Sequence, residues 1–191
     1  MFRCGNRNKT NRRGRDRFLL LHHKAIILME TASAPVVTKN VSGRRELHFH
    51  AIDEIVADAE KLVASPNIKT LGNWPLGRLL AHLTTAINGS IDGVDARAPL
   101  LFRLAGKLVK NRILNSAMLP GFQLPDRFQA DLFPEVESPQ DALEGLLKAA
   151  ARAKTERMTA RHPVFGQLTH DEWTQLHLRH AELHLSFVVP E

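Results

Sequence analysis

The sequence predicts an all-α fold, a four-helix bundle with a long crossover connection that carries an extra amphipathic helix. Four segments place apolar residues at spacings of three and four, as one face of a helix requires. A longer stretch lies between the second and third of these segments, and prolines interrupt its second half. The chain shows no Gly-rich phosphate loop, no Gly-x-Ser-x-Gly elbow and no series of strands that would indicate another fold class.

Length and composition limit the class of protein. The 191 residues, of which 43% are hydrophobic, are enough for one domain with a buried core. The single cysteine, Cys4, excludes an internal disulfide and a cysteine-rich zinc site. No apolar run approaches the roughly 18 residues of a membrane span. We therefore expect no membrane partner and a cytoplasmic location, with export by an N-terminal signal left open.

Residues 1–44 are interpreted as a basic, disordered leader in front of a domain over residues 45–191. The net charge of +6 is concentrated in this leader, because residues 1–28 hold eight basic residues and one acidic residue. The remainder holds 18 basic and 19 acidic residues. The domain is therefore nearly neutral, and we expect it to bind no nucleic acid. A nucleic-acid-binding function would rest on the leader alone.

Three interpretations of the leader remain open. It is a disordered arm, an export signal with a cleavage-like site at residues 32–34, or an artefact of gene prediction with Met29 as the true start. Two histidines and a lysine at residues 22–24 interrupt the apolar run that a signal would need. We favour Met29 as the start and leave the leader out of the fold.

The first helix is predicted over residues 51–64, where apolar positions alternate with acidic residues and a lysine at helical spacing. Residues 65–67, Ser-Pro-Asn, end it because proline cannot continue a helix. In front of this helix, residues 30–44 are expected to be irregular. Residues 45–49 are expected to form a short extended approach.

The second helix is predicted to begin after Trp74-Pro75, with Asn73 as its N-cap and Pro75 in its first turn. Residues 89–93 are expected to form its end and a turn, since they contain two glycines. His82 lies on the flank of the apolar stripe. Taken by itself, a histidine in this position would more often be a neutral edge residue than a ligand.

The long connection is predicted to contain an amphipathic helix over residues 100–114. We interpret its basic residues as a solvated face rather than as a site for a polyanion (Arg103, Lys107, Lys110, Arg112). A connection of this length often covers a site. The third bundle helix is predicted over residues 140–159, with Ser138 as its N-cap and Pro139 at the first position.

The last helix is predicted from Thr169 to Val188. Thr169 and Glu172 have the spacing of a capping box, in which each side chain accepts a hydrogen bond from a backbone N–H of the first turn. Trp173 begins an apolar stripe that continues at spacings of three and four. Pro190 is expected to stop the helix.

Three histidines lie on the apolar face of this last helix: His177, His180 and His184. His180 and His184 are four residues apart, so they lie about 40° apart around the axis and about 6 Å apart along it. An unpaired buried imidazole costs about 1–3 kcal/mol. Two imidazoles at this spacing can share a metal ion, and we favour this interpretation over pairing with core carbonyls or a position at the edge of the apolar stripe. A third ligand must come from elsewhere, and His82 is the only histidine on another predicted helix.

Two segments resemble motifs of the DinB/YfiT-like superfamily. Residues 74–83 are similar to its second-helix signature, and residues 179–184 are similar to its last-helix His-x-x-x-His motif. Members are four-helix bundles that hold a divalent metal with three histidines. The resemblance covers roughly residues 45–190. Residues 72–92 and 162–190 look like a branch known only as a domain of unknown function.

The resemblance implies that His82, His180 and His184 are metal ligands. Three histidines suit zinc, nickel, copper and iron alike, and of these divalent ions we favour zinc or nickel. It further implies a thiol S-transferase or a hydrolase that activates water, with a small-molecule substrate and, for the transferase, a low-molecular-weight thiol. Three protein ligands leave a position open, as catalytic metals require. A homodimer also fits the superfamily. Leu183 and the Ser-Phe pair at 186–187 depart from its pattern and leave the substrate undefined.

Four residues are candidates for a catalytic base or for a partner of a metal ligand: Glu182, His177, Asp92 and His162. The alternative function is a non-catalytic metal-binding or stress-response bundle with structural histidines. A pocket blocked by Phe187 and Leu183 would favour this alternative.

Overall fold

The computed structural model describes residues 35–95, 98–121 and 138–191. From Val36 onward the described residues form one compact unit. The predictions for residues 1–34 of the leader lie outside the described residues, as does the part of the long connection at residues 122–137. Among the described residues, no helix has the length and apolarity that a bilayer span requires.

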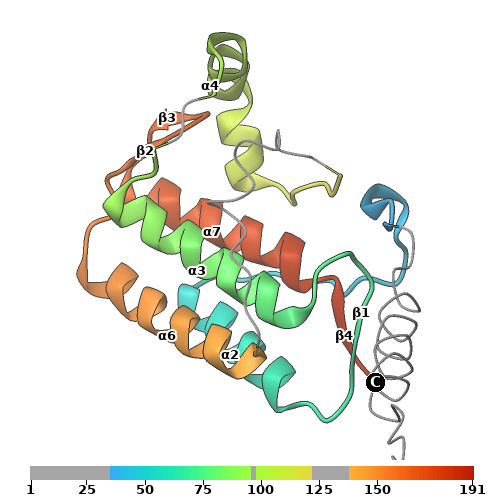
Figure 1. Cartoon of the computed structure of the whole chain (residues 1–191). Coiled ribbons are helices and arrows are strands. Elements are labelled where there is room, and N and C mark those ends of the chain that lie inside the picture. Colours follow the sequence, from blue (N-terminus) through green and yellow to red (C-terminus); the bar gives the residue numbers. More distant parts are fainter. Residues whose placement is uncertain (1–34, 96–97, 122–137) are drawn as a thin grey trace, which may run out of the picture. The chain divides into compact units, whose positions relative to one another are not determined.

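Four helices form a bundle, which confirms the predicted fold class (Figure 1). They are α2 (Ile52–Ala64), α3 (Leu76–Asp92), α6 (Pro139–Thr155) and α7 (His170–Leu185). Helix α3 packs against α6 and α7, and α2 packs against the same two helices from the other side. Each helix contributes fully buried aliphatic side chains to the shared core (Ile55, Leu80, Leu146, Leu178).

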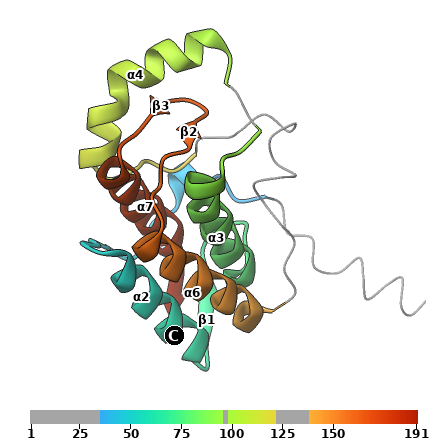
Figure 2. The ribbon, with the colours of Figure 1, turned by 90° about the vertical axis from the view of Figure 1, so that its left-hand side faces the viewer.

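Helix α4 (Leu100–Asn115) lies in the long connection, as predicted, and contacts α7 (Figure 2). The expectation that its basic side chains form the solvated face is wrong in part, because Arg103 and Lys110 are half-buried. Six large apolar side chains are exposed instead (Leu100, Leu101, Phe102, Leu104, Leu108, Val109). The helix is turned this way because Gly106 lies against Val164, so closely that a Cβ at this glycine would be 2.6 Å from Val164 Cγ1.

Helix α7 begins as predicted and ends earlier. Thr169 Oγ1 accepts the N–H of Glu172 at 3.1 Å, and the Glu172 carboxylate accepts the N–H of Thr169 at 2.9 Å. The capping box is thus confirmed. The helix stops at Leu185 rather than at Val188, because Val188–Pro190 forms strand β4, which pairs with β1 (Ile68–Thr70) in antiparallel register.

Replacing Thr169 by alanine is expected to lower the free energy of unfolding by about 1 kcal/mol, because the N–H of Glu172 loses its acceptor. Chemical denaturation measures this change. Thr155→Ala, an exposed site at the end of α6, serves as the control and should change the free energy by less than about 0.5 kcal/mol. Equal losses in the two variants would contradict the capping role.

Three other boundaries differ from the predictions. Asn73 does not cap α3, because its side chain accepts the N–H of Val36 at 2.6 Å and donates to the Val36 carbonyl at 2.9 Å. Helix α3 passes through the predicted turn and ends at Asp92, before Gly93 with φ of +88°. Helix α6, capped by Ser138 as predicted, stops at Thr155 instead of residue 159.

The remaining elements are short. A 3-10 turn, η1 (Thr38–Asn40), precedes the bundle, and residues 45–49 run along α7 without joining a sheet. Strands β2 (Arg161–His162) and β3 (Gly166–Gln167) form a hairpin between α6 and α7. The chain therefore enters α7 from a tight turn that lies beside α4 (Figure 2).

Candidate metal centre

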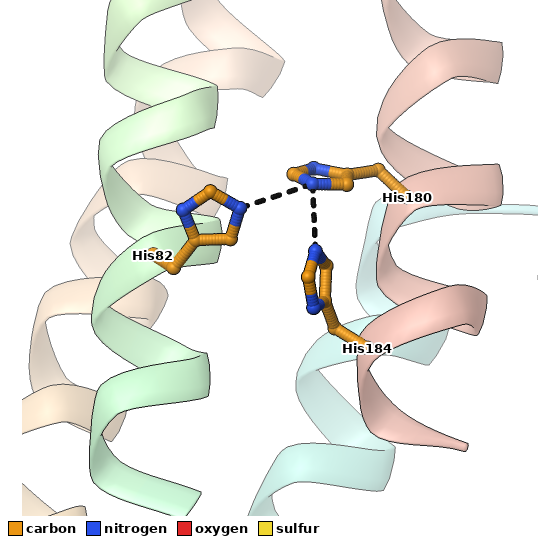
Figure 3. A group of neighbouring side chains, drawn as sticks. All are labelled: His82, His180 and His184. Atoms are coloured by element: carbon orange, nitrogen blue, oxygen red, sulfur yellow. Dashed lines mark hydrogen bonds between the residues drawn. The ribbon is translucent and has the colours of Figure 1, made fainter. Parts of the chain in front are cut away.

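Three histidines from two helices meet inside the bundle (Figure 3). His82 lies in the second turn of α3, and His180 and His184 lie one turn apart in the second half of α7. Nε2 of His180 is 3.1 Å from Nε2 of His82 and 2.9 Å from Nε2 of His184. One ring nitrogen of each residue lies within 4.8 Å of the other two. The structure thus brings together the three residues that the resemblance implied as ligands.

The packing of α3 explains why His82 points inward. The neighbouring side chains Ala81 and Leu83 are both buried, and His82 itself is only 6% exposed. The sequence analysis placed His82 on the flank of the apolar stripe. The buried face is wider than the spacing of the leucines indicates, because α6 and α7 both cover α3.

The arrangement of the three Nε2 atoms suits a cation. A neutral imidazole has one N–H and one lone pair, so Nε2 of His180 has two close neighbours for a single hydrogen-bonding site. When each ring carries its hydrogen on Nδ1, all three Nε2 lone pairs can face one metal ion. Two nitrogens bound to a tetrahedral zinc ion lie roughly 3.3 Å apart, close to the two separations found here. The clustered histidines can therefore bind a metal ion.

The surroundings of His180 and His184 keep these two rings unprotonated. Burial, together with the charge of His82, lowers the pKa of His184 to about 3. Burial lowers the pKa of His180 well below its usual value, and the neighbouring imidazoles, first of all His184, add to the effect. Metal ligation requires the neutral imidazole, so both residues are in the ligating form at pH 7.

Trp74 forms one wall of the centre. Its ring is stacked on that of His184 at 5.4 Å between centroids and 12° between planes, and it meets the ring of His82 edge-on at 5.5 Å. The guanidinium of Arg78 lies 5.5 Å from the Trp74 ring centroid on α3. Trp74 belongs to the motif at residues 74–83, but no local pattern in the sequence predicts its contact with two of the three histidines.

A comparison with protein families places the whole bundle in one of them. The family model described as "Protein of unknown function (DUF1569)" matches residues 41–191. The chain belongs to the DUF1569 family. The match includes His82, His180, His184 and Trp74. Searches of curated proteins and of solved structures found no match to this chain.

Two of the candidate catalytic residues of this DUF1569 chain, His177 in the middle of α7 and His162 in β2, lie on the same tryptophan, Trp173. His177 is 4% exposed and stacks on Trp173, with 5.5 Å between ring centroids and 17° between planes. Its Nε2 has no hydrogen-bond partner among the described residues. Burial and the charge of His162 lower the pKa of His177 to about 3.

His162 is held by its own hairpin. Its Nδ1 accepts the backbone N–H groups of Val164 and Phe165, both at 3.0 Å, and its ring stacks on that of Phe165 at 4.5 Å. Burial lowers the pKa of His162 to about 4. These contacts give His162 a role in shaping the turn before α7.

The two acidic candidates are engaged elsewhere in this DUF1569 fold. Glu182 accepts the backbone N–H of Phe49 at 2.7 Å and pairs with Arg179 at 2.6 Å. Glu182 is two residues from both His180 and His184 on α7, so it lies about 160° around the helix axis from each of them. Asp92 pairs with Arg152 at 2.7 Å, at the end of α3 about 15 Å along the axis from His82.

Two cavities of the DUF1569 domain lie away from the three clustered histidines. One, of about 300 Å³, is lined by residues before and at the start of α7, including Arg157 and His170. The other, of about 400 Å³, lies between α4 and the β2–β3 hairpin. Neither is lined by the three clustered histidines. Phe187 packs against Gly72, and the Arg44 guanidinium lies over its ring at 4.9 Å.

Proposed function

We propose that this protein is a divalent-metal-dependent enzyme of the DinB-like superfamily, with His82, His180 and His184 as the metal ligands. The observation that carries the proposal is the convergence of their ring nitrogens within 4.8 Å from two helices. Burial favours the neutral, ligating form of His180 and His184. Three protein ligands leave one coordination position for water, a thiol or a substrate.

Two reactions are proposed as alternatives. In one, a low-molecular-weight thiol is transferred to a small-molecule substrate, and in the other, activated water hydrolyses the substrate. A zinc or nickel ion in such a site acts as a Lewis acid on its fourth ligand and lowers the pKa of a bound water or thiol. The protein's part is to fix the ligands. Trp74 restrains the rings of His184 and His82 through its ring contacts with both. The helical spacing of His180 and His184 fixes the positions of two of the three ring nitrogens relative to each other.

His177 supports this chemistry as a hydrogen-bonding residue rather than as a general base. An efficient base has a pKa near the working pH, whereas burial lowers the pKa of His177 to about 3. A neutral buried imidazole one turn before His180 can instead offer Nε2 to a bound substrate or water. It is the candidate of the four that best fits a role beside the metal.

Elemental analysis of the purified chain tests the ligand set. We expect about one zinc or nickel ion per chain in the wild type and less than a tenth of that in the double variant His180→Ala/His184→Ala. His50→Ala is the matched control, because this exposed histidine lies outside the cluster, and it should retain the full metal content. Equal metal content in all three proteins would contradict the assignment.

A non-catalytic metal-binding bundle is the second candidate. It is favoured by the burial of the cluster, in which His82 is only 6% exposed. Replacement of the native metal by Co²⁺ separates the two functions. If the fourth position is open, a small thiol should change the visible spectrum of the cobalt protein at millimolar concentration. A spectrum that no thiol or anion alters would support the closed, non-catalytic site.

A further inference from the structure

The cavity of about 400 Å³ between α4 and the β2–β3 hairpin, named here the basic cavity, is lined by four cationic side chains and no acidic one. They come from two elements far apart in the sequence, three from α4 and one from β2 (Arg103, Lys107, Lys110, Arg161). Like charges gathered around one hollow repel each other, so such a cluster favours an anion between them.

The geometry of α4 explains how the charges gather. Arg103, Lys107 and Lys110 are spaced by four and three residues, which puts them on one face of the helix. Gly106 lies on the side of α4 that contacts Val164, where a side chain would hold the hairpin away. The helix is thereby close enough to the hairpin for Arg161 to line the same cavity.

One of the four charges is already compensated. Lys110 forms an ion pair with Glu172, the residue that caps the start of α7. Arg103, Lys107 and Arg161 form no ion pair within the described parts of the chain. Arg103 is half-buried, where the surrounding protein weakens solvent screening of its charge. The cavity thus presents three uncompensated cations.

The rest of the lining is apolar or uncharged. Val164 and Phe165 provide an apolar wall, and Phe165 is fixed by its stacking on His162. Gly166 and Gln167 of β3 complete the lining. Glu172, beside the cavity, lies eight residues before His180, about 12 Å along the axis of α7, so the metal centre and the basic cavity are separate sites.

We propose that the basic cavity binds a small organic oxyanion, a phosphate or carboxylate group joined to an apolar moiety. The oxyanion lies between Arg103, Lys107 and Arg161, where each arginine guanidinium can bind two oxygens at once and the lysine ammonium adds a third positive charge. The apolar moiety packs against Val164 and Phe165. This site does not depend on the reaction proposed for the metal.

The test is a titration of the full-length, metal-loaded protein followed by two-dimensional amide NMR at constant ionic strength. Phenyl phosphate and benzoate are the probes for the two anion types, with benzyl alcohol as the uncharged control. We expect saturable shifts at the amides of Gly166 and Gln167 with one or both anions. Phosphate-only and carboxylate-only saturation both support the site and identify its anion.

Two variants of exposed residues on α4 make the result specific. Lys107→Ala, inside the cavity, should weaken binding of the saturating probe at least fivefold. Arg112→Ala removes the same charge from the same helix but lies outside the cavity lining, and should change binding less than twofold. Shifts that never saturate, or equal weakening in the two variants, would overturn the proposal. Metal content is unaffected in either case, so this outcome is independent of the proposed enzyme function.

Discussion

Lowering the pH from 7 to 5 is expected to reduce the free energy of unfolding of the metal-free protein by about 4 kcal/mol through His177 and His184 alone. Burial lowers the pKa of both imidazoles to about 3, with added effects from the charge of His162 on His177 and of His82 on His184. In the unfolded chain a histidine titrates near pH 6.5. The unfolded state therefore binds more protons in this range, and stability falls as the pH falls from 6.5 toward 3.

Chemical denaturation of chelator-treated protein at several pH values between 7 and 5 measures this loss. The variant His177→Phe keeps an aromatic ring beside Trp173 and removes one titrating group. Over the same range it should lose about 2 kcal/mol less than the wild type. An equal loss in both proteins would mean that His177 takes up its proton in the folded state and is not shielded from water.

Replacing Glu182 by alanine is expected to lower the free energy of unfolding by about 3–5 kcal/mol. Its carboxylate is 7% exposed, accepts the N–H of Phe49 at 2.7 Å and pairs with Arg179 at 2.6 Å. Arg179 in turn donates to the carbonyl of Phe49 at 2.8 Å. Without the carboxylate, a half-buried guanidinium and a buried N–H lose their acceptor, and the segment before α2 loses its link to α7.

Denaturation midpoints and metal content, measured together, distinguish a structural from a catalytic role for Glu182. Glu182→Gln keeps an oxygen for the N–H of Phe49 and should lose less stability than the alanine variant. Glu144→Ala removes an exposed ion pair with Lys148 and should leave the melting temperature unchanged. A Glu182→Ala protein with wild-type stability but reduced metal content would contradict the structural role.

Local patterns in the sequence were sufficient for the features that depend on neighbouring residues. The capping box of Thr169 and Glu172 involves four consecutive positions, and Ser138 likewise caps the helix that directly follows it. The spacing of His180 and His184 places both on one face because a helix repeats every 3.6 residues. His82, which is 98 positions before His180, could be connected with the same site only as the single histidine on another predicted helix and through the resemblance.

Features that depend on distant contacts could not be predicted in this way. Val188 and Val189 extend the apolar pattern of the last helix, and only the pairing with Ile68–Thr70 makes them a strand. Asparagine is a residue type favoured at N-caps, yet the side-chain amide of Asn73 forms hydrogen bonds with the backbone of Val36 instead. The orientation of α4 depends on the close contact between Gly106 and Val164. These two residues are far apart in the sequence, and the helical spacing of apolar residues does not predict their contact.

The β1–β4 pair has a consequence for the metal centre. Strand β1 ends six residues before α3, which carries His82, and β4 begins three residues after α7, which carries His180 and His184. The register of Thr70 opposite Val188 thus ties together the near ends of the two helices that supply the nitrogens. Residues that do not contact the clustered histidines thus help to set the distance between their ring nitrogens. If the proposed metal site is under selection, that selection extends to β4, because substitutions in β4 would change the spacing of the three histidines without replacing any of them.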